Sequence, residues 1–262
     1  MASTPTPNPV SVLWSVVRAL RTVPAPRPTG SGELSHSALE APLRYLAKEG
    51  PRVLADLTEV LDAYLGTLIG VDPDTLSRHE ALATWINVYN TGALLLAGRA
   101  QRDGRTSVLR VPGGFRHPFL KIAGEELSLD DIEHAKLRRF GDPRIHTALV
   151  CGSVSCPTLR GEPYSGSTLS KQLDDQTSYF LASGGCVVER DRHRVSLSRV
   201  FLWFGGDFVR PHRMPTFLPP RRRSLLEALI PWLPAETAAW VRASNPEIEF
   251  QRYDWGLSCT VR

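Results

Sequence analysis

The chain has 262 residues, which is enough for one large domain or two small ones and for a core that needs no disulfide or metal staples. Its hydrophobic fraction of 42% and charged fraction of 22% are ordinary for a globular protein. The net charge is +4, but the basic residues are scattered, and only Arg221 to Arg223 form a tight run. We interpret that run as a solvated loop and expect no nucleic-acid partner.

The first residues lack the features of a secretion signal. The apolar stretch from Val10 to Leu20 is interrupted by Ser11, Ser15 and Arg18, and no charged region precedes it. No run approaches the roughly 18 apolar residues that a membrane span requires. We therefore expect a cytoplasmic protein without a membrane span, in which the cysteines stay reduced.

Helical periodicity dominates the first third of the chain. Residues 1–9, rich in Pro, Ser and Thr, are expected to be disordered, and Pro24 to Gly32 is predicted to be a linker. We therefore treat 1–32 as a disordered or loosely attached segment, followed by a single domain over 33–262. Apolar residues recur at helical spacing in three stretches: Val10–Thr22, Ser35–Lys48 and Pro51–Leu65.

The clearest helix is predicted from Ser77 to Ala97. Its apolar surface is broad, which is typical of a central, buried helix. Asn87 and Asn90 interrupt that surface at a three-residue spacing, so they share one face.

The pattern changes after this helix. Phe119 to Leu127 is predicted to form a hairpin, and Ser128 is a helix N-cap before a helix from Leu129 to Phe140. The compact apolar run Ile145 to Val150 predicts a strand. The remaining predicted elements are a helix over Ser167–Ser183, a hairpin of Cys186–Glu189 with Arg194–Leu197, helices over Leu225–Leu233 and Ala235–Ala243, and a strand over Ile248–Trp255.

These elements predict an α+β fold, in which a helical N-terminal half packs on a small, mostly antiparallel sheet. Chemistry-bearing residues concentrate just after the strand predicted over 145–150. Cys151 and Cys156 bracket a turn of Gly and Ser, where a thiol can be exposed and its thiolate stabilised by backbone N–H groups. Cys186 and Cys259 lack such surroundings, and we interpret both as structural.

The partner of a reactive thiol stays open at this point. His146, His134 and His117 are the candidate imidazoles. On a regular strand His146 and Cys151 would face opposite sides, so His146 would reach Cys156 more easily. Three alternatives compete: buried structural thiols, a zinc site of His146 and the two thiols with Glu133 or His134 as fourth ligand, and a dithiol pair. The ligand spacing is unlike that of zinc sites, so we expect no metal and no cofactor.

Several separated motifs together resemble the domain of unknown function 547 family. The first is the helix Trp85–Asn90, the second is Leu127–His134, and the third is His146–Pro157. Tyr164, a block around Val195–Ser198, Phe201, Trp203, Asp207 and Phe208, and Tyr253–Trp255 extend the likeness. The resemblance implies a Tyr where Phe204 stands. It also implies a site in which the Asn helix, the following Glu and the His–Cys segment recur together.

Two functions from different classes follow from these residues. In the first, Cys151 or Cys156 is the nucleophile of an acyl-transfer enzyme or hydrolase, His146 or His134 is its base, and Asn87 or Asn90 orients a group or binds an oxyanion. Glu133 belongs to the same candidate site. The substrate would be an unidentified small molecule or peptide. In the second, the polar residues form a buried network in a non-catalytic binding or scaffold module. A metal-binding protein is the weaker third interpretation.

Overall fold

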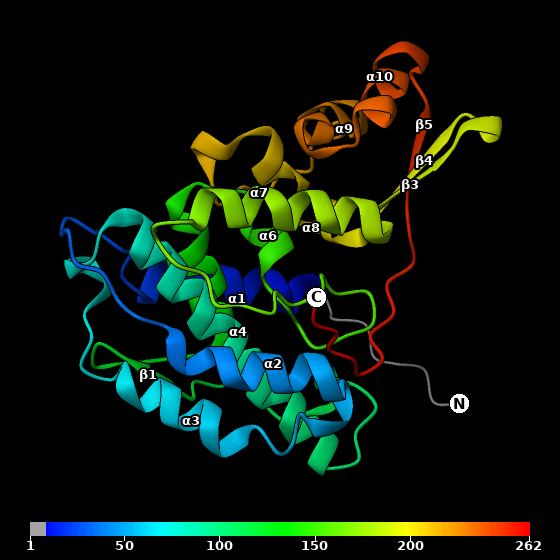
Figure 1. Cartoon of the computed structure of the whole chain (residues 1–262). Helices are drawn as coiled ribbons and strands as arrows, with labels where there is room; N and C mark the ends of the chain where they lie inside the picture. Colours follow the sequence, from blue (N-terminus) through cyan, green and yellow to red (C-terminus); the bar gives the residue numbers. More distant parts are fainter. Residues whose placement is uncertain (1–8) are drawn as a thin grey trace. The chain divides into compact units, whose positions relative to one another are not determined.

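The computed structural model describes residues 9–262 (Figure 1). The chain forms two compact units. The first unit comprises the residues up to Phe140 together with Leu149–Leu169 and Asp254–Arg262. The second comprises Gly141–Ala148 and Ser170–Tyr253.

The domain prediction made from the sequence, a single domain over 33–262 with a loosely attached 1–32, stays a prediction. The disorder expected for 1–9 concerns residues that, apart from Pro9, lie outside the described range. Helix α1 (Pro9–Thr22) belongs to the first unit, where the Arg18 guanidinium contacts the Asp131 carboxylate at 2.8 Å.

Helix α4 (Arg78–Arg102) organises the first unit. Ser77 caps it by accepting the Glu80 N–H, and every residue from Glu80 to Gly98 is buried. This confirms the central buried helix predicted from the apolar pattern. The other elements of the unit are α1, α2 (Glu40–Glu49), α3 (Thr58–Thr67), β1 (Leu120–Ile122), β2 (Glu125–Leu127) and α5 (Leu129–Asp131).

The hairpin and the helix start that follow it are as predicted. Strands β1 and β2 pair antiparallel, with Leu120 opposite Leu127. Ser128 and Asp131 form a reciprocal capping box, in which each side chain accepts the other residue's backbone N–H. The helix then changes its winding, because Ile132–Lys136 is a π-helical turn (η5) and Leu137–Phe140 is 3₁₀ (η6). No local pattern in the sequence indicates that change.

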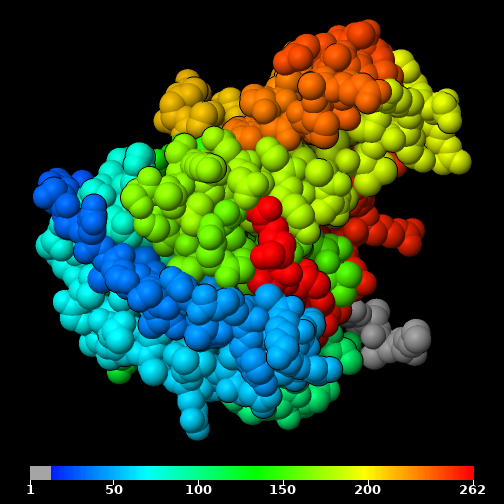
Figure 2. Space-filling view, in the orientation of Figure 1, coloured from blue at the N-terminus to red at the C-terminus, as the bar shows by residue number. Residues whose placement is uncertain are grey.

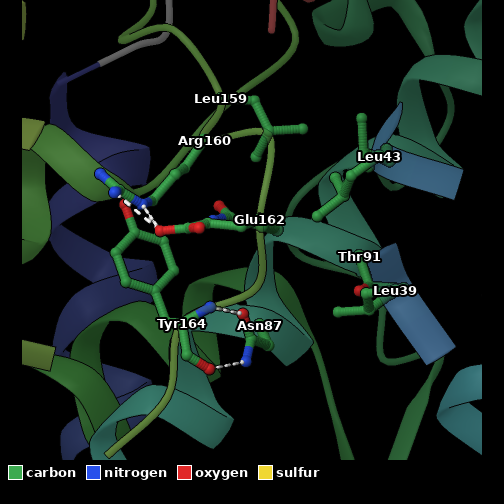
Figure 3. Close-up of a pocket in the computed structure, with 10 residues that line it drawn as sticks. Leu39, Leu43, Asn87, Thr91, Leu159, Arg160, Glu162 and Tyr164 are labelled. Atoms are coloured by element: carbon green, nitrogen blue, oxygen red, sulfur yellow. Dashed lines mark hydrogen bonds and ion pairs between the residues drawn. The ribbon is translucent and has the colours of Figure 1, made fainter. Parts of the chain in front are cut away.

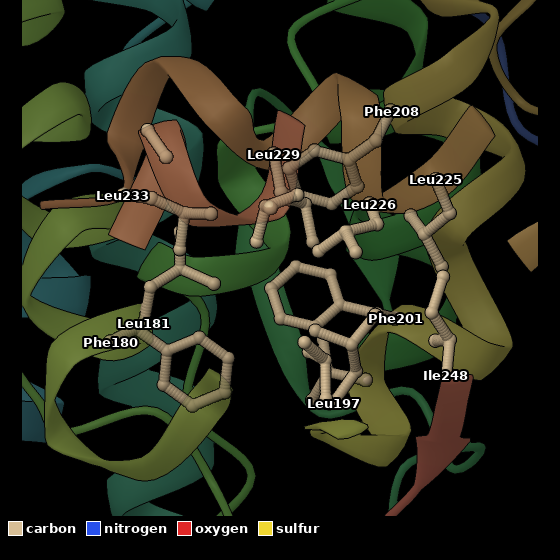
Figure 4. Packing of buried hydrophobic residues seen from close by; sticks show 14 residues of the cluster. Phe180, Leu181, Leu197, Phe201, Phe208, Leu225, Leu226, Leu229, Leu233 and Ile248 are labelled. Atoms are coloured by element: carbon tan, nitrogen blue, oxygen red, sulfur yellow. The ribbon is translucent and has the colours of Figure 1, made fainter. Parts of the chain in front are cut away.

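The second unit builds its own core around helix α8 (Arg199–Val209), as Figure 4 shows. Phe201 packs edge-on against Phe208 with ring centroids 5.3 Å apart, and leucines of α9 close over them. Strands β3 and β4 pair antiparallel, and β5 adds parallel to β4. The elements are α6 (Ile145–Ala148), α7 (Leu169–Phe180), β3 (Cys186–Glu189), β4 (Arg194–Leu197), α8, α9 (Arg222–Leu229), α10 (Ala235–Ser244) and β5 (Glu247–Phe250).

The fold is α+β, with helices over 55% of the chain and strands over 10%. One prediction within it is wrong: Ile145–Ala148 is a short helix, α6, and not the start of a strand. All six residues from Ile145 to Val150 are buried. A short apolar run buried on every side carries no periodicity that separates strand from helix. The strand alternation that set His146 opposite Cys151 therefore does not apply.

None of the helices in the described part of the chain has both the length and the hydropathy that crossing a bilayer requires.

Candidate functional site

The loop Cys151–Cys156 carries two thiols and is called the thiol loop here. Two polar residues of α4 hold the segments on either side of it. The Asn87 side chain donates from Nδ2 to the Tyr164 carbonyl at 2.8 Å, and its Oδ1 accepts the Tyr164 N–H at 2.9 Å (Figure 3). Asn90 Oδ1 accepts the Val150 N–H at 3.0 Å. Asn87 thus fixes the backbone at Tyr164, while Asn90 fixes the chain one residue before Cys151.

A small hollow adjoins these two asparagines. One wall is apolar, and the other carries an ion pair between Arg160 and Glu162 at 2.7 Å (Figure 3). The hollow is lined by Leu39, Leu43, Asn87, Asn90, Thr91, Leu94, Leu159, Arg160, Glu162 and Tyr164.

Glu133 is presented by the π-helical turn that follows the capping box. Insertions of this kind in helices occur frequently at functional sites, because the wider turn re-aims side chains. The Tyr89 hydroxyl of α4 donates to Glu133 Oε2 at 3.1 Å. Burial, followed by the negative charge of Asp130, raises the pKa of Glu133 to about 7, with a smaller contribution from charge on Cys151, while the Arg138 charge and the Tyr89 hydroxyl lower it. Glu133 can therefore take up or release a proton near neutral pH.

His134, the next residue on the turn, is buried, and its Nδ1 lies 3.5 Å from an Arg138 guanidinium nitrogen. The positive charge of the same Arg138 side chain lowers the pKa of Glu133, so one guanidinium acts on both neighbours.

The loop that carries the two thiols is fixed by backbone hydrogen bonds. Gly152 adopts a left-handed conformation at φ 74°, and a Cβ there would lie 3.1–3.2 Å from Val108 and Ala97. The segment after Tyr253 returns to this loop: Gly256 O accepts the Val154 N–H at 2.9 Å, and the Ser258 N–H donates to Gly152 O at 3.1 Å.

The two thiols of the loop differ in their surroundings. The Cys156 sulfur accepts the backbone N–H of Cys151, and burial raises the pKa of this thiol well above its ordinary value, as does the neighbouring Cys151. The Cys151 sulfur lies 2.9 Å from the Ser153 hydroxyl, and Cys151 is partly exposed. Burial also raises the pKa of Cys186 to about 11 and that of Cys259 to about 12.

Tyr89 and Glu133 are near enough to Cys151 for electrostatic coupling. Charge on Cys151 raises the pKa of both residues, after burial as the main cause. Tyr89 was overlooked in the sequence although it lies in the same helical motif as the asparagines. A buried tyrosine hydroxyl usually has a hydrogen-bond partner, so a tyrosine on a helix predicted to be buried could have been identified as a member of a polar site.

His146 lies in the second unit, where it forms a buried pair with Asp207. Its Nε2 is 2.9 Å from Asp207 Oδ2, and the other carboxylate oxygen accepts both the N–H and the hydroxyl of Thr216, at 2.7 and 2.8 Å. Phe204 stacks on the imidazole at 4.0 Å and 11°. The position at which the resemblance implied a Tyr thus holds a ring that packs face-on against His146.

Among the described residues, no cluster of three or more His, Cys, Asp or Glu side chains has the arrangement of a metal site.

Comparison with known protein families identifies a match in the central part of the chain. Residues 73–181 match the family described as "Protein of unknown function, DUF547". This segment belongs to the DUF547 family. The DUF547 segment contains α4, Glu133, His146, Cys151 and Cys156, while Asp207 lies outside the matched residues. No curated protein and no solved structure matches the chain.

Proposed function

We propose that this DUF547 protein is a thiol-dependent acyl-transfer enzyme, most simply a hydrolase, with Cys151 as its nucleophile. The observation that carries the proposal is the electrostatic coupling between a partly exposed thiol and a carboxyl group whose pKa is raised to about 7. Groups with such perturbed pKa values concentrate at functional sites.

The chemistry of the proposed reaction is nucleophilic catalysis in two steps. The Cys151 thiolate attacks an acyl carbon, and a thioester forms as the leaving group departs with a proton from a general acid. Water then attacks the thioester, and the same group, now a base, accepts the proton of that water. Glu133 fits this role because its pKa of about 7 allows both protonation states at neutral pH.

Other residues of the site are proposed as positioning groups. Asn90 holds the backbone at Val150, so it fixes the start of the thiol loop. Tyr89 orients the Glu133 carboxyl through its hydroxyl. Cys156 is not proposed as the nucleophile, because its raised pKa keeps it protonated at neutral pH.

His146 stays an alternative base, as the sequence predicted. Its hydrogen bond to the Asp207 carboxylate is the arrangement that fixes an imidazole tautomer and supports a positive charge on the ring. His134 is less suited to this role, since its Nδ1 faces the Arg138 guanidinium. The substrate is proposed to be a small molecule or peptide with an activated acyl group.

Alkylation of the full chain with iodoacetamide tests the proposal. The modified cysteines are identified by mass spectrometry between pH 6 and 9. We expect Cys151 to react roughly tenfold faster at pH 7 than a model cysteine peptide, which is only a few per cent thiolate there. Cys156, Cys186 and Cys259 should react more slowly than the peptide, because their pKa values are raised.

Three variants assign the base. Glu133→Gln removes a negative charge near the thiol, so Cys151 should alkylate at least as fast while turnover of an activated ester is lost. His146→Gln and Asp207→Asn should slow alkylation only if His146 stabilises the thiolate. A Cys151 that reacts no faster than the peptide in the wild-type protein overturns the enzyme proposal.

The same experiment addresses the second candidate function, a non-catalytic binding or scaffold module. This candidate is favoured by Asn87, whose donor and acceptor both bond the Tyr164 backbone and so fix packing. A scaffold module predicts four inert thiols.

A further inference from the structure

The segment between Phe208 and Leu226 has a charge unlike that of the rest of the chain. It contains five arginines and one histidine but no acidic residue, whereas the whole chain has 31 basic and 27 acidic residues. Three of these arginines, Arg221 to Arg223, are the run that was interpreted from the sequence as a solvated loop. The proposed thiol chemistry uses none of them.

Two large apolar side chains lie exposed in this segment, and we call the two residues its tip. Phe217 is 53% exposed and Leu218 is 70% exposed, and they are adjacent in the chain. The gold segment that contains them lies at the surface of the molecule in Figure 2. Exposing two neighbouring apolar side chains of this size to water costs solvation free energy, which is recovered only when something covers them.

The tip has a fixed backbone. The Thr216 backbone N–H and hydroxyl both donate to the buried Asp207 carboxylate, and Arg210 donates to the Leu218 carbonyl. A Cβ at Gly206 would overlap the Thr216 side chain, so α8 approaches the loop closely. The prolines of the loop further restrict its backbone; they are Pro211, Pro215, Pro219 and Pro220. Phe217 and Leu218 are therefore presented by a braced loop.

Positive charge flanks the tip on both sides in the sequence. His212, Arg213 and Arg221 are exposed. The acidic residues nearest in the sequence have other partners, since Asp207 is buried against Thr216 and His146, and Glu227 pairs with Arg223 at 2.9 Å. The segment thus combines an apolar projection with exposed cationic side chains on both sides of it.

We propose that the loop Arg210–Arg221 docks on an anionic lipid membrane, with Phe217 and Leu218 entering the interface and the arginines contacting lipid phosphates. An apolar tip with basic flanks fits a medium that has apolar chains beneath anionic headgroups. Nucleic acid would satisfy the arginines but would leave Leu218 without an apolar environment. This inference is independent of the thiol chemistry, because a membrane-bound protein needs no reactive cysteine.

Co-sedimentation of the full chain with vesicles tests the docking. Vesicles of phosphatidylcholine with about 30 mol% phosphatidylserine, a composition chosen to resemble an anionic leaflet, are compared with pure phosphatidylcholine at low and physiological salt. We expect binding to the anionic vesicles alone, weakening as salt rises. Each arginine removed should lower the affinity about fivefold. Arg213→Ala with Arg221→Ala should therefore weaken binding roughly 25-fold.

The apolar tip is tested by matched variants. Phe217→Ser with Leu218→Ser should abolish most binding, while Leu218→Phe should keep it. The control Val60→Ser with Ile69→Ser changes exposed apolar residues of the first unit, which are 40% and 53% exposed, and should bind like wild type. Arg21→Ala with Arg242→Ala is the control for net charge. Thermal unfolding of each variant confirms that it is folded.

Two results overturn the proposal. One is the absence of sedimentation with anionic vesicles at low salt. The other is a Phe217→Ser, Leu218→Ser protein that binds these vesicles as well as the wild type, which would assign the binding to charge elsewhere. A protein that binds duplex DNA or polyglutamate but does not sediment with anionic vesicles gives the first of these results.

Discussion

Glu133 couples protein stability to pH because its carboxyl group is enclosed by the fold. Its pKa is raised from 4.5 to about 7, mainly by burial. The folded state therefore binds a proton more tightly than the unfolded state between these two values. The resulting stabilisation is fully present below pH 4.5 and is lost as pH rises through 7.

Replacement of Glu133 by Gln should remove this dependence. A shift of this size corresponds to roughly 3 kcal/mol in unfolding free energy, so Glu133→Gln should be more stable than wild type by about that amount at about pH 8 and no more stable at about pH 4. Urea unfolding at both pH values measures the difference. The control is Glu59→Gln, which changes an exposed carboxylate of α3. If the difference in unfolding free energy between wild type and Glu133→Gln did not change with pH, Glu133 would not be the group with the raised pKa.

The sequence identified which residue types were unusual, but not their partners. Asn87 and Asn90 stood out because amides are rare on an apolar helix, and the structure gives them the Tyr164 and Val150 backbone as partners. The carboxylate beside His146 was missed as part of the site, since Asp207 is 61 residues away in the chain. The spacing of residues in the sequence predicts which side chains are neighbours on the same helix or strand. It does not predict which side chains of different elements meet.

At the scale of elements, short sequence patterns predicted the features that depend on interactions between residues close together in the chain. The cap Ser128 was predicted correctly because a capping side chain bonds a backbone N–H only a few residues away. Ser77, predicted as the first residue of the central helix, is the N-cap of that helix. The π-helical turn and helix α6 were not foreseen. Both depend on how buried side chains pack against distant residues, which no short window of sequence contains.

The segment Asp254–Arg262 should control the mobility of the thiol loop. It pairs with the chain after Cys156: the Leu159 N–H donates to Thr260 O at 2.8 Å, and the Gly161 N–H donates to Arg262 O at 3.0 Å. Deletion of residues 257–262 removes these acceptors. Hydrogen exchange at Leu159 and at Gly161 should then accelerate about fivefold or more, since each lost bond contributes about 1 kcal/mol.

Mass spectrometry of peptides covering residues 149–162 measures this exchange. Peptides from α4 should keep their protection in the same sample. Thr260→Ala alters an exposed side chain but keeps the backbone acceptor, so it should exchange like wild type. Unchanged protection after the deletion would show that the loop is held without the segment.

At the scale of the whole molecule, the chain passes four times between the two compact units, at residues 140–141, 148–149, 169–170 and 253–254. The DUF547 segment 73–181 therefore contains parts of both units and the whole of neither. It lacks the buried residues of α2 and α3 and, apart from Phe180 and Leu181, the residues that form the second core.

A fragment of residues 73–181 should consequently fail to fold cooperatively. Among the buried residues that it lacks are the leucines Leu43, Leu46, Leu54 and Leu61 of the first unit. Their burial contributes about 6–12 kcal/mol, which is comparable with the total stability of a domain. Circular dichroism should show a broad thermal transition for the fragment and a sharp one for the full chain. A sharp transition in the fragment would show that the segment folds alone.

The pairing of the thiol loop with residues 254–262 has a consequence for biosynthesis. A ribosome makes Cys151 and Cys156 long before it makes Gly256 and Ser258, whose backbone groups bond the loop. During that interval residues 170–253 are still being added, and the two thiols lack this part of their native surroundings. The two thiols are thus more open to oxidation in the nascent chain than in the folded protein, until the residues that bond their loop have been translated.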